Sequence, residues 1–238
     1  ADGLQGARIG IPRALYYDSV SVPGSETSQN RLSTEGRSVM LEAIDVLREQ
    51  GATIVDPADI PSVVDPDPLN NVLASPQSSV LSYGMKRDFN AWLVTLGESA
   101  PVKTLTELRE WNLAHEQAGT LKYGQARLDG ADELDLEGNR AEYEADRARD
   151  LRLNGEHGID EVIKALKLDA LLFPASSGAG LSARPGYPTV IVPFAFAQSE
   201  PDPPMPAGVD LKPRPFGVSF AGVACSEARL IELAFAFE

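Results

Sequence analysis

The sequence predicts an α/β protein in which a mixed sheet is flanked by helices, with a mainly helical segment inserted in the middle. Three observations support this fold class. Strand and helix patterns alternate over residues 1–66, helical patterns dominate residues 67–166, and strand patterns return over residues 167–238 before a closing helix. We interpret the three regions as parts of one domain, because 238 residues can bury a sizeable core.

The first region has the pattern of a β-α-β unit. Residues 7–12 (ARIGIP) are a short apolar strand candidate that Pro12 ends. Residues 52–57 (ATIVDP) are a second strand candidate, so the two strands should be parallel and joined by a right-handed crossover. The helix between them should end before Gly51 and has apolar residues at helical spacing: Val39, Met40, Ala43, Ile44 and Leu47.

The middle region contains a sequence signature of a helix start. Thr104 and Glu107 form a capping box, in which the Thr hydroxyl accepts from the Glu107 amide and the carboxylate reaches back. The apolar side of this helix should hold Leu105, Leu108 and Leu113. Residues 139–153 alternate in charge and predict an amphipathic helix with a solvated outer face.

The last region is rich in strand candidates. Residues 168–174 (LDALLFP) have the composition of a buried strand and follow a short helix near residues 159–166. Residues 187–196 and 216–222 are two further strands, separated by a proline-rich loop at 198–215. Ser226 should cap the final helix, with Glu227 at its positive end.

Composition excludes several classes of function. The formal net charge is −14, from 35 acidic against 21 basic residues, and no basic cluster offsets it, so we expect no nucleic-acid partner. One cysteine and two histidines make a disulfide framework or a zinc site improbable. We find no membrane-length apolar run and no signal peptide, and the cytoplasm is favoured while the location stays open.

Two binding motifs match in part and are rejected. The glycines at 178 and 180 follow a strand, as in a dinucleotide site, but Pro185, Gly186 and Pro188 should prevent the helix that such a site needs. Residues 133–144 space their carboxylates like a calcium loop. Because glutamates stand where short acidic residues are preferred, we interpret that segment as a polar turn leading into a helix.

The residues with catalytic side chains also have ordinary interpretations. His115 is a candidate general base, but we favour a hydrogen-bonded structural role because no nucleophile is in view. His157, between glycines, has the position of a helix-end histidine. Cys225 follows an apolar run, so a buried, inert thiol is favoured over a reactive one.

The stretch PASSGAG, residues 174–180, raises the question of a serine nucleophile. A hydrolytic serine needs a base within reach and nearby oxyanion donors. The chain contains no G-x-S-x-G elbow and no S-x-x-K motif, and nothing near Ser176 or Ser177 supplies a base. We therefore expect neither serine to attack a substrate.

From Gly6 to Glu238 the chain resembles the C-terminal half of an amidase signature family enzyme, with peptide-amidase-like members the most similar branch. The similar segments are LQGARIGIPR, LTELREWNLAHE, LDALLFPASSGAG, GYPTVIVPFAF and PFGVSFAGVACSEARLIELAFAFE, in that order. The run from Leu168 onward carries the most specific match. The resemblance implies an α/β/α fold of which this chain is the C-terminal portion.

The resemblance also implies a chemistry and a set of site residues. Enzymes of this family use a serine, a cis-serine and a lysine, without metal or cofactor, and those positions fall before the equivalent of Arg8, outside this chain. We name no catalytic residue. The substrate-pocket candidates that the resemblance implies are Ser176, Ser177, Gly178, Gly186 and Tyr187.

The function expected from the resemblance is hydrolysis of a small-molecule or peptide carboxamide to a carboxylate and ammonia by the full-length parent. This chain alone should supply pocket walls and be inactive. Two alternatives stay open: a free-standing, non-catalytic binding or interaction domain derived from an amidase, and a subunit of an amidotransferase. Self-association into a homodimer would cover an apolar surface left exposed.

Overall fold

The computed structural model describes residues 2–30, 32–198, 205–206, 208–209 and 212–238. The chain forms two compact units. Residues Pro76–Arg149 make up one, which we call the helical unit, and the described residues before and after it make up the other, the sheet unit. The expectation that all three sequence regions belong to a single amidase domain stays a prediction.

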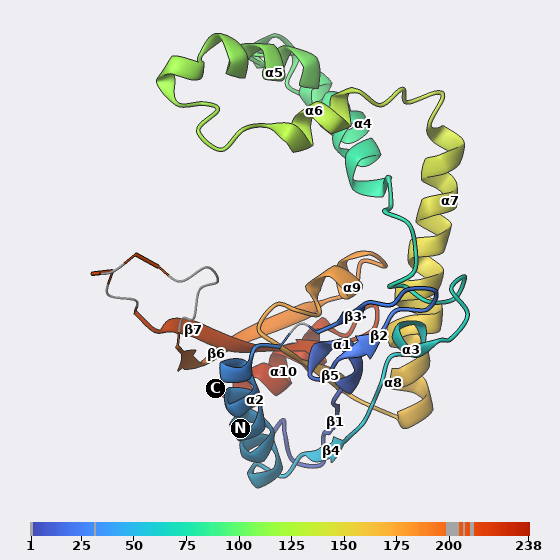
Figure 1. The fold of residues 1–238 in the computed structure, drawn as a ribbon, viewed down its shortest axis with the longest axis vertical. Coiled ribbons are helices and arrows are strands. Elements are labelled where there is room, and N and C mark those ends of the chain that lie inside the picture. The colour runs from blue at the N-terminus through green and yellow to red at the C-terminus, as the bar shows by residue number, and fades with distance from the viewer. Residues whose placement is uncertain (1, 31, 199–204, 207, 210–211) are drawn as a thin grey trace. The chain divides into compact units, whose positions relative to one another are not determined.

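A five-stranded mixed sheet forms the centre of the sheet unit (Figure 1). The strand order is β4-β1-β5-β7-β6. Strand β1 pairs in parallel with β4 and β5, and β7 pairs antiparallel with β5 and β6, which confirms the predicted mixed sheet. The strands are β1 (Arg8–Gly10), β4 (Thr53–Val55), β5 (Ala170–Pro174), β6 (Thr189–Ala197) and β7 (Arg214–Ala221). A separate antiparallel pair joins β2 (Val20–Ser21) and β3 (Ser28–Gln29).

Helices of the sheet unit connect and cover these strands. They are α1 (Arg13–Tyr16), α2 (Thr34–Glu49), α3 (Pro61–Val64), the π-helical segment η3 (Leu151–Asp160), α8 (Glu161–Leu166), α9 (Ala179–Ala183) and α10 (Glu227–Phe237). Half of the predicted loop at 198–215 lies outside the described residues, and its last two residues already belong to β7. None of the helices in the described part of the chain has both the length and the apolar character that a membrane crossing requires.

Helices α2 and α10 pack on the same face of the sheet. Phe216 and Phe220 lie four residues apart on β7, and this even spacing places them on one face of the sheet. A Cβ built on Gly36 of α2 would lie 3.0 Å from the Phe216 ring, and the Phe237 ring of α10 is centred 5.8 Å from that of Phe220. The residues of α2 predicted to face the core are all buried: Val39, Met40, Ala43, Ile44 and Leu47.

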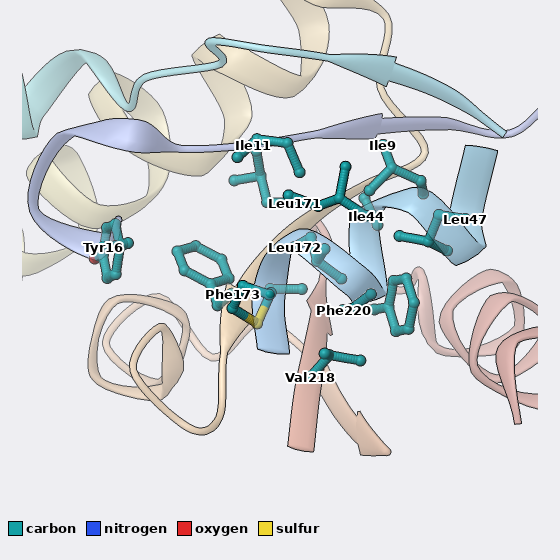
Figure 2. Packing of buried hydrophobic residues seen from close by; sticks show 14 of the residues in the cluster. Ile9, Ile11, Tyr16, Ile44, Leu47, Leu171, Leu172, Phe173, Val218 and Phe220 are labelled. Atoms are coloured by element: carbon teal, nitrogen blue, oxygen red, sulfur yellow. The ribbon is translucent and has the colours of Figure 1, made fainter. Parts of the chain in front are cut away.

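The core is built around β5, whose five residues are all buried (Figure 2). This burial agrees with the uninterrupted apolar run in the sequence, which is typical of a strand covered on both faces. The ring of Phe173 meets that of Tyr16 edge-on, with centroids 4.6 Å apart. The hydroxyl of buried Tyr17 donates to the carbonyl of Leu172 over 2.9 Å, so the segment after β1 is tied to the centre of the sheet.

The helical unit consists of four α-helices and two short 3-10 turns within the described residues. They are α4 (Val80–Thr95), η1 (Gly97–Ser99), α5 (Leu105–Ala114), η2 (Glu116–Ala118), α6 (Ala126–Asp132) and α7 (Arg140–Asp150), the last ending one residue beyond the unit. Arg109 joins α5 to α6 by contacting Asp129 and Asp132, each at 2.6 Å. The predicted helical character of the middle region is therefore present.

Several local predictions need correction. Thr104 caps α5 as expected, but the Glu107 carboxylate accepts from the amide of Lys103 instead of that of Thr104. Leu113 was expected on the apolar side of α5 and is 55% exposed. The hydroxyl of Ser226 donates to the Val223 carbonyl and caps no amide.

The expectation of a buried Cys225 is also wrong. The residue has φ +62° in the turn that leads into α10, and its side chain is exposed. The apolar run before it ends with β7 at Ala221, and the turn that follows has already reached the surface at Ala224 and Cys225.

His157 connects two segments that are distant in sequence. Its ring contacts Glu161 through Nδ1 at 2.7 Å and Asp65, just after α3, through Nε2 at 2.9 Å. Burial opposes the charged ring, but the hydrogen bonds to both carboxylates outweigh burial and raise the pKa of His157 above its ordinary value of 6.5. Glu156 and Arg152 line the same shallow hollow. His157 thus stands at a kink inside η3, where the backbone leaves helical geometry, with a structural ion pair on each side of its ring.

This pair of contacts predicts a pH-dependent local stability. A raised folded-state pKa stabilises the fold fully below pH 6.5, and that contribution disappears as the pH rises through the folded pKa. Hydrogen exchange of the α8 amides, corrected for the intrinsic effect of pH, should show protection that falls as the pH rises above 6.5 and through the raised pKa of His157.

Substituting each histidine in turn tests whether His157 causes the pH dependence. His157→Gln should remove the pH-dependent part of the protection, whereas His115→Gln should leave it in place. The same fall in His157→Gln would show that another group is responsible.

Candidate functional site

A hollow of about 320 Å³ lies at the carboxyl end of β5. In open α/β sheets the carboxyl ends of parallel strands are where ligands bind, and β5 is parallel to its neighbour β1. We call this feature the Ser176 hollow. The residues that line it are Leu32, Ser33, Pro174, Ala175, Ser176, Ser177, Arg214 and Phe216.

The turn that carries the two serines is attached firmly to β7. The amide of Ala175 donates to the Gly217 carbonyl over 2.8 Å, and the Ser219 hydroxyl donates to the Ala175 carbonyl. Within the turn, the Ser177 amide donates to the Pro174 carbonyl over 3.0 Å. Ala175 has φ +45°, a conformation that this bonding on both sides maintains. The bonds that the amide and the carbonyl of Ala175 form with β7 thus give the serines a defined position.

Gly178 closes the turn against an aromatic ring. A Cβ at this position would lie 2.5 Å from Cγ of the buried Phe173 ring, which leaves no room for a larger residue. Gly180, two residues later in α9, has nothing within 4 Å of the corresponding position. The glycine requirement in this loop is therefore steric and specific to Gly178.

Gly186 and Tyr187 occupy a different part of the sheet unit. Gly186 has φ +84°, and the Tyr187 amide donates to the Ser182 carbonyl over 2.8 Å, which ends the segment after α9. The Tyr187 hydroxyl donates to Asp160 Oδ2 over 2.6 Å. Burial, followed by this hydrogen bond, raises the pKa of Tyr187 to about 12.

The structure thus separates the predicted pocket residues into two groups. Ser176 and Ser177 line the hollow and Gly178 supports their turn, whereas Gly186 and Tyr187 do not line it and lie beside η3. Arg214 and Phe216 are not among the residues predicted from the sequence. They carry no motif of their own, and only the antiparallel pairing of β7 with β5 brings them to the serine turn.

Comparison with known proteins identifies what the fold and this turn resemble. No family model matches the chain. A probable amidase from Arabidopsis thaliana is 28% identical over 229 residues, which cover 96% of this chain and 41% of the relative. The native peptide amidase of Stenotrophomonas maltophilia superposes with a TM-score of 0.72 at 27% identity, covering 100% of this chain and 43% of that one. The predicted resemblance to amidase signature enzymes is confirmed.

A second amidase structure gives the same result with a ligand present. The peptide amidase PAM, in complex with the competitive inhibitor chymostatin, matches with a TM-score of 0.72 at 26% identity, covering 100% of this chain and 44% of that one. The chain spans about two fifths of the length of the amidases it matches, which is consistent with the expected C-terminal portion. The fold class predicted from the sequence is the fold of these amidases.

The chemistry available in the Ser176 hollow is limited. Its lining contains no lysine, histidine, aspartate or glutamate among the described residues. A serine oxygen attacks an amide only when a base removes its proton, so this part of the amidase fold holds hydroxyl groups without an adjacent base. The lining residues that the structure describes can hydrogen-bond a ligand and shape its surroundings.

The rejected motifs are placed by the structure as follows. Helix α9 lies within the glycine segment and ends at Ala183, and residues 184–188 are not helical, so the helix that a dinucleotide site needs does not follow the glycines, as expected. The calcium-like segment is a turn followed by α7, and the described residues contain no cluster of three or more metal-binding side chains. His115 ends α5, where its ring is exposed, stacks on Trp111 at 4.0 Å and contacts that residue's carbonyl.

The contrast between two neighbouring glycines gives a testable prediction. Gly178→Ala should destabilise the sheet unit by about 1–3 kcal/mol because the new methyl group overlaps a buried ring. Gly180→Ala, the matched control, should be neutral or stabilise by up to about 1 kcal/mol, since alanine favours the helix.

Urea unfolding should be followed by far-UV circular dichroism. Tryptophan fluorescence would not serve here, because both tryptophans, Trp92 and Trp111, lie in the helical unit. Equal stability of the two variants would contradict the steric role of Gly178.

Proposed function

We propose that this chain is the C-terminal part of an amidase that hydrolyses a carboxamide to a carboxylate and ammonia. The observation that carries the proposal is similarity to peptide amidase over the whole chain, with a TM-score of 0.72 and 27% identity. The expected parent is longer than this chain, because the chain spans about two fifths of the amidases it matches.

In the proposed reaction a serine oxygen adds to the amide carbonyl carbon, and the C–N bond breaks as ammonia leaves with the serine proton. Water then hydrolyses the acyl-serine, releasing the carboxylate and restoring the hydroxyl. The Ser–cis-Ser–Lys triad that the resemblance implies would be supplied by a part of the parent outside this chain. The absence of a base from the described lining of the Ser176 hollow supports that assignment. The reaction requires no metal or cofactor.

The proposed role of this chain is to form walls of the substrate pocket. The turn bearing Ser176 and Ser177, supported by Gly178, is held in place by β7, and its exposed residue Ser176 lines the hollow. Gly186 and Tyr187 would contribute to a second portion of the wall, with the Tyr187 hydroxyl positioned by Asp160. Since a similar structure holds the inhibitor chymostatin, we propose a peptide or another small amide as substrate.

The test compares this chain with a product of the same coding sequence extended upstream of Ala1. Ammonia release from a peptide amide should be detectable for the extended protein and absent for this chain alone. In the extended protein, Ser176→Ala and Ser177→Ala should change activity by less than about tenfold, because loss of a nucleophile costs far more, on the order of 10⁶-fold in kcat.

Two results would contradict the proposal. Ammonia release by this chain alone that disappears in Ser176→Ala or Ser177→Ala would make one of these serines the nucleophile. A start codon directly before Ala1, combined with an inactive protein, would favour the free-standing binding domain. The exposed side chains of Ile191 and Phe196 on the sheet-edge strand β6 would then be a candidate surface for a homodimer.

A further inference from the structure

Arg214 differs from several other arginines of the sheet unit in its hydrogen-bond and ion-pair partners. It begins β7 and lines the Ser176 hollow with an exposed side chain. Other arginines of the sheet unit are paired with carboxylates: Arg13 with Asp56, Arg37 with Asp18, and Arg229 with Asp169. The guanidinium of Arg214 forms no hydrogen bond or ion pair with any residue that the structure describes.

The surroundings of Arg214 are unusual for so acidic a protein. The chain has 35 acidic and 21 basic residues, yet the described lining of the hollow contains one cation and no carboxylate. Ser176 is exposed in the same hollow, and no described residue bonds its hydroxyl. A planar cation and a hydroxyl donor thus share one small space in which the described lining offers no carboxylate.

The other lining residues are four apolar residues together with Ser33 and Ser177. Phe216 is buried against α2, and Pro174 is the last residue of the buried strand β5. The bonds of Ala175 with the Gly217 carbonyl and the Ser219 hydroxyl of β7 keep the serine turn in position. A ligand here would therefore meet the two donors and a short apolar surface.

We propose that the Ser176 hollow binds a carboxylate group, with the Arg214 guanidinium and the Ser176 hydroxyl as its donors. Guanidinium matches the geometry of a carboxylate because it donates two parallel N–H bonds, and such charge-assisted bonds are stronger than neutral ones. The hollow, at about 320 Å³, is of the size that small ligands occupy. The carbon chain of the ligand would lie against Phe216 and Pro174.

This inference rests on the proposed function and narrows its substrate class. If the hollow is a wall of an amidase pocket, the substrate is an amide that carries a separate carboxylate. Arg214 would then determine specificity without taking part in the cleavage of the C–N bond. A neutral amide of the same size would leave the guanidinium unpaired inside the pocket and would bind less well.

The experiment measures binding to this chain alone, so it does not depend on catalysis. Succinamate, which carries one amide and one carboxylate, is titrated at 0.15 M NaCl against succinamide, in which both groups are amides. Backbone amide shifts in ¹H–¹⁵N spectra should move and saturate for residues 175–178 with succinamate. Succinamide should bind at least about tenfold more weakly, since a charged hydrogen-bonded pair contributes roughly that factor or more.

Variants assign the effect to Arg214. Arg214→Gln should weaken succinamate binding about tenfold or more, while Arg214→Lys, which keeps the charge but loses the planar fork, should have an intermediate effect. Arg140→Gln removes the same charge from an exposed position in the helical unit and should bind like the original chain. Spectra of each variant without ligand check that the fold is retained.

The outcomes separate this inference from the proposed function. Equal binding of succinamate and succinamide, unchanged binding in Arg214→Gln, or shifts away from residues 175–178 would each overturn the carboxylate site. None of these results bears on ammonia release by the extended protein. Conversely, an inactive extended protein whose C-terminal part still binds succinamate through Arg214 would refute the amidase and leave the site established.

Discussion

The burial of β5 is the constraint on which the sheet unit depends. All five residues of this strand are inside the protein, and its neighbours run in opposite directions, β1 parallel and β7 antiparallel. Its apolar side chains can be buried on both faces only if helices cover the sheet. The position of the strand also determines where the chain leaves the core after Pro174. The turn after Pro174 is therefore presented beside the start of β7, and the candidate site exists because those two chain segments meet.

The parts of the fold that the sequence predicted are those with a strong periodic signal. Alternating strand and helix patterns gave β1, α2 and β4 in parallel arrangement, and the apolar run at 168–174 gave β5. In each case the order of apolar and polar residues within the element itself indicates which side chains are buried. The final helix and the two strands before it were predicted for the same reason. The fold class followed because strand-rich ends around a helical middle allow few arrangements.

The candidate site could be predicted only in part, because its residues come from separate elements. Ser176, Ser177 and Gly178 stand in one turn, and a glycine-serine turn after a strand is visible in the sequence. Arg214 follows a proline-rich stretch and has no local signal, so it enters the site solely through the register of β7 on β5.

The errors in the predicted helix caps arise because several nearby backbone groups compete for the same polar side chain. Ser226 bonds the Val223 carbonyl and Glu107 reaches the Lys103 amide, since each polar side chain takes the nearest partner that the backbone offers.

The exposure of Cys225 has a practical consequence. It is the single cysteine of the chain, it lies on the surface of the sheet unit, and it stands in a turn and outside the core. A thiol-reactive dye or a surface anchor would therefore attach at one known point, with no need to remove other cysteines. That point precedes α10 and is not among the residues that line the Ser176 hollow. The native sequence thus already contains a unique chemical handle for immobilising this unit with its hollow unmodified.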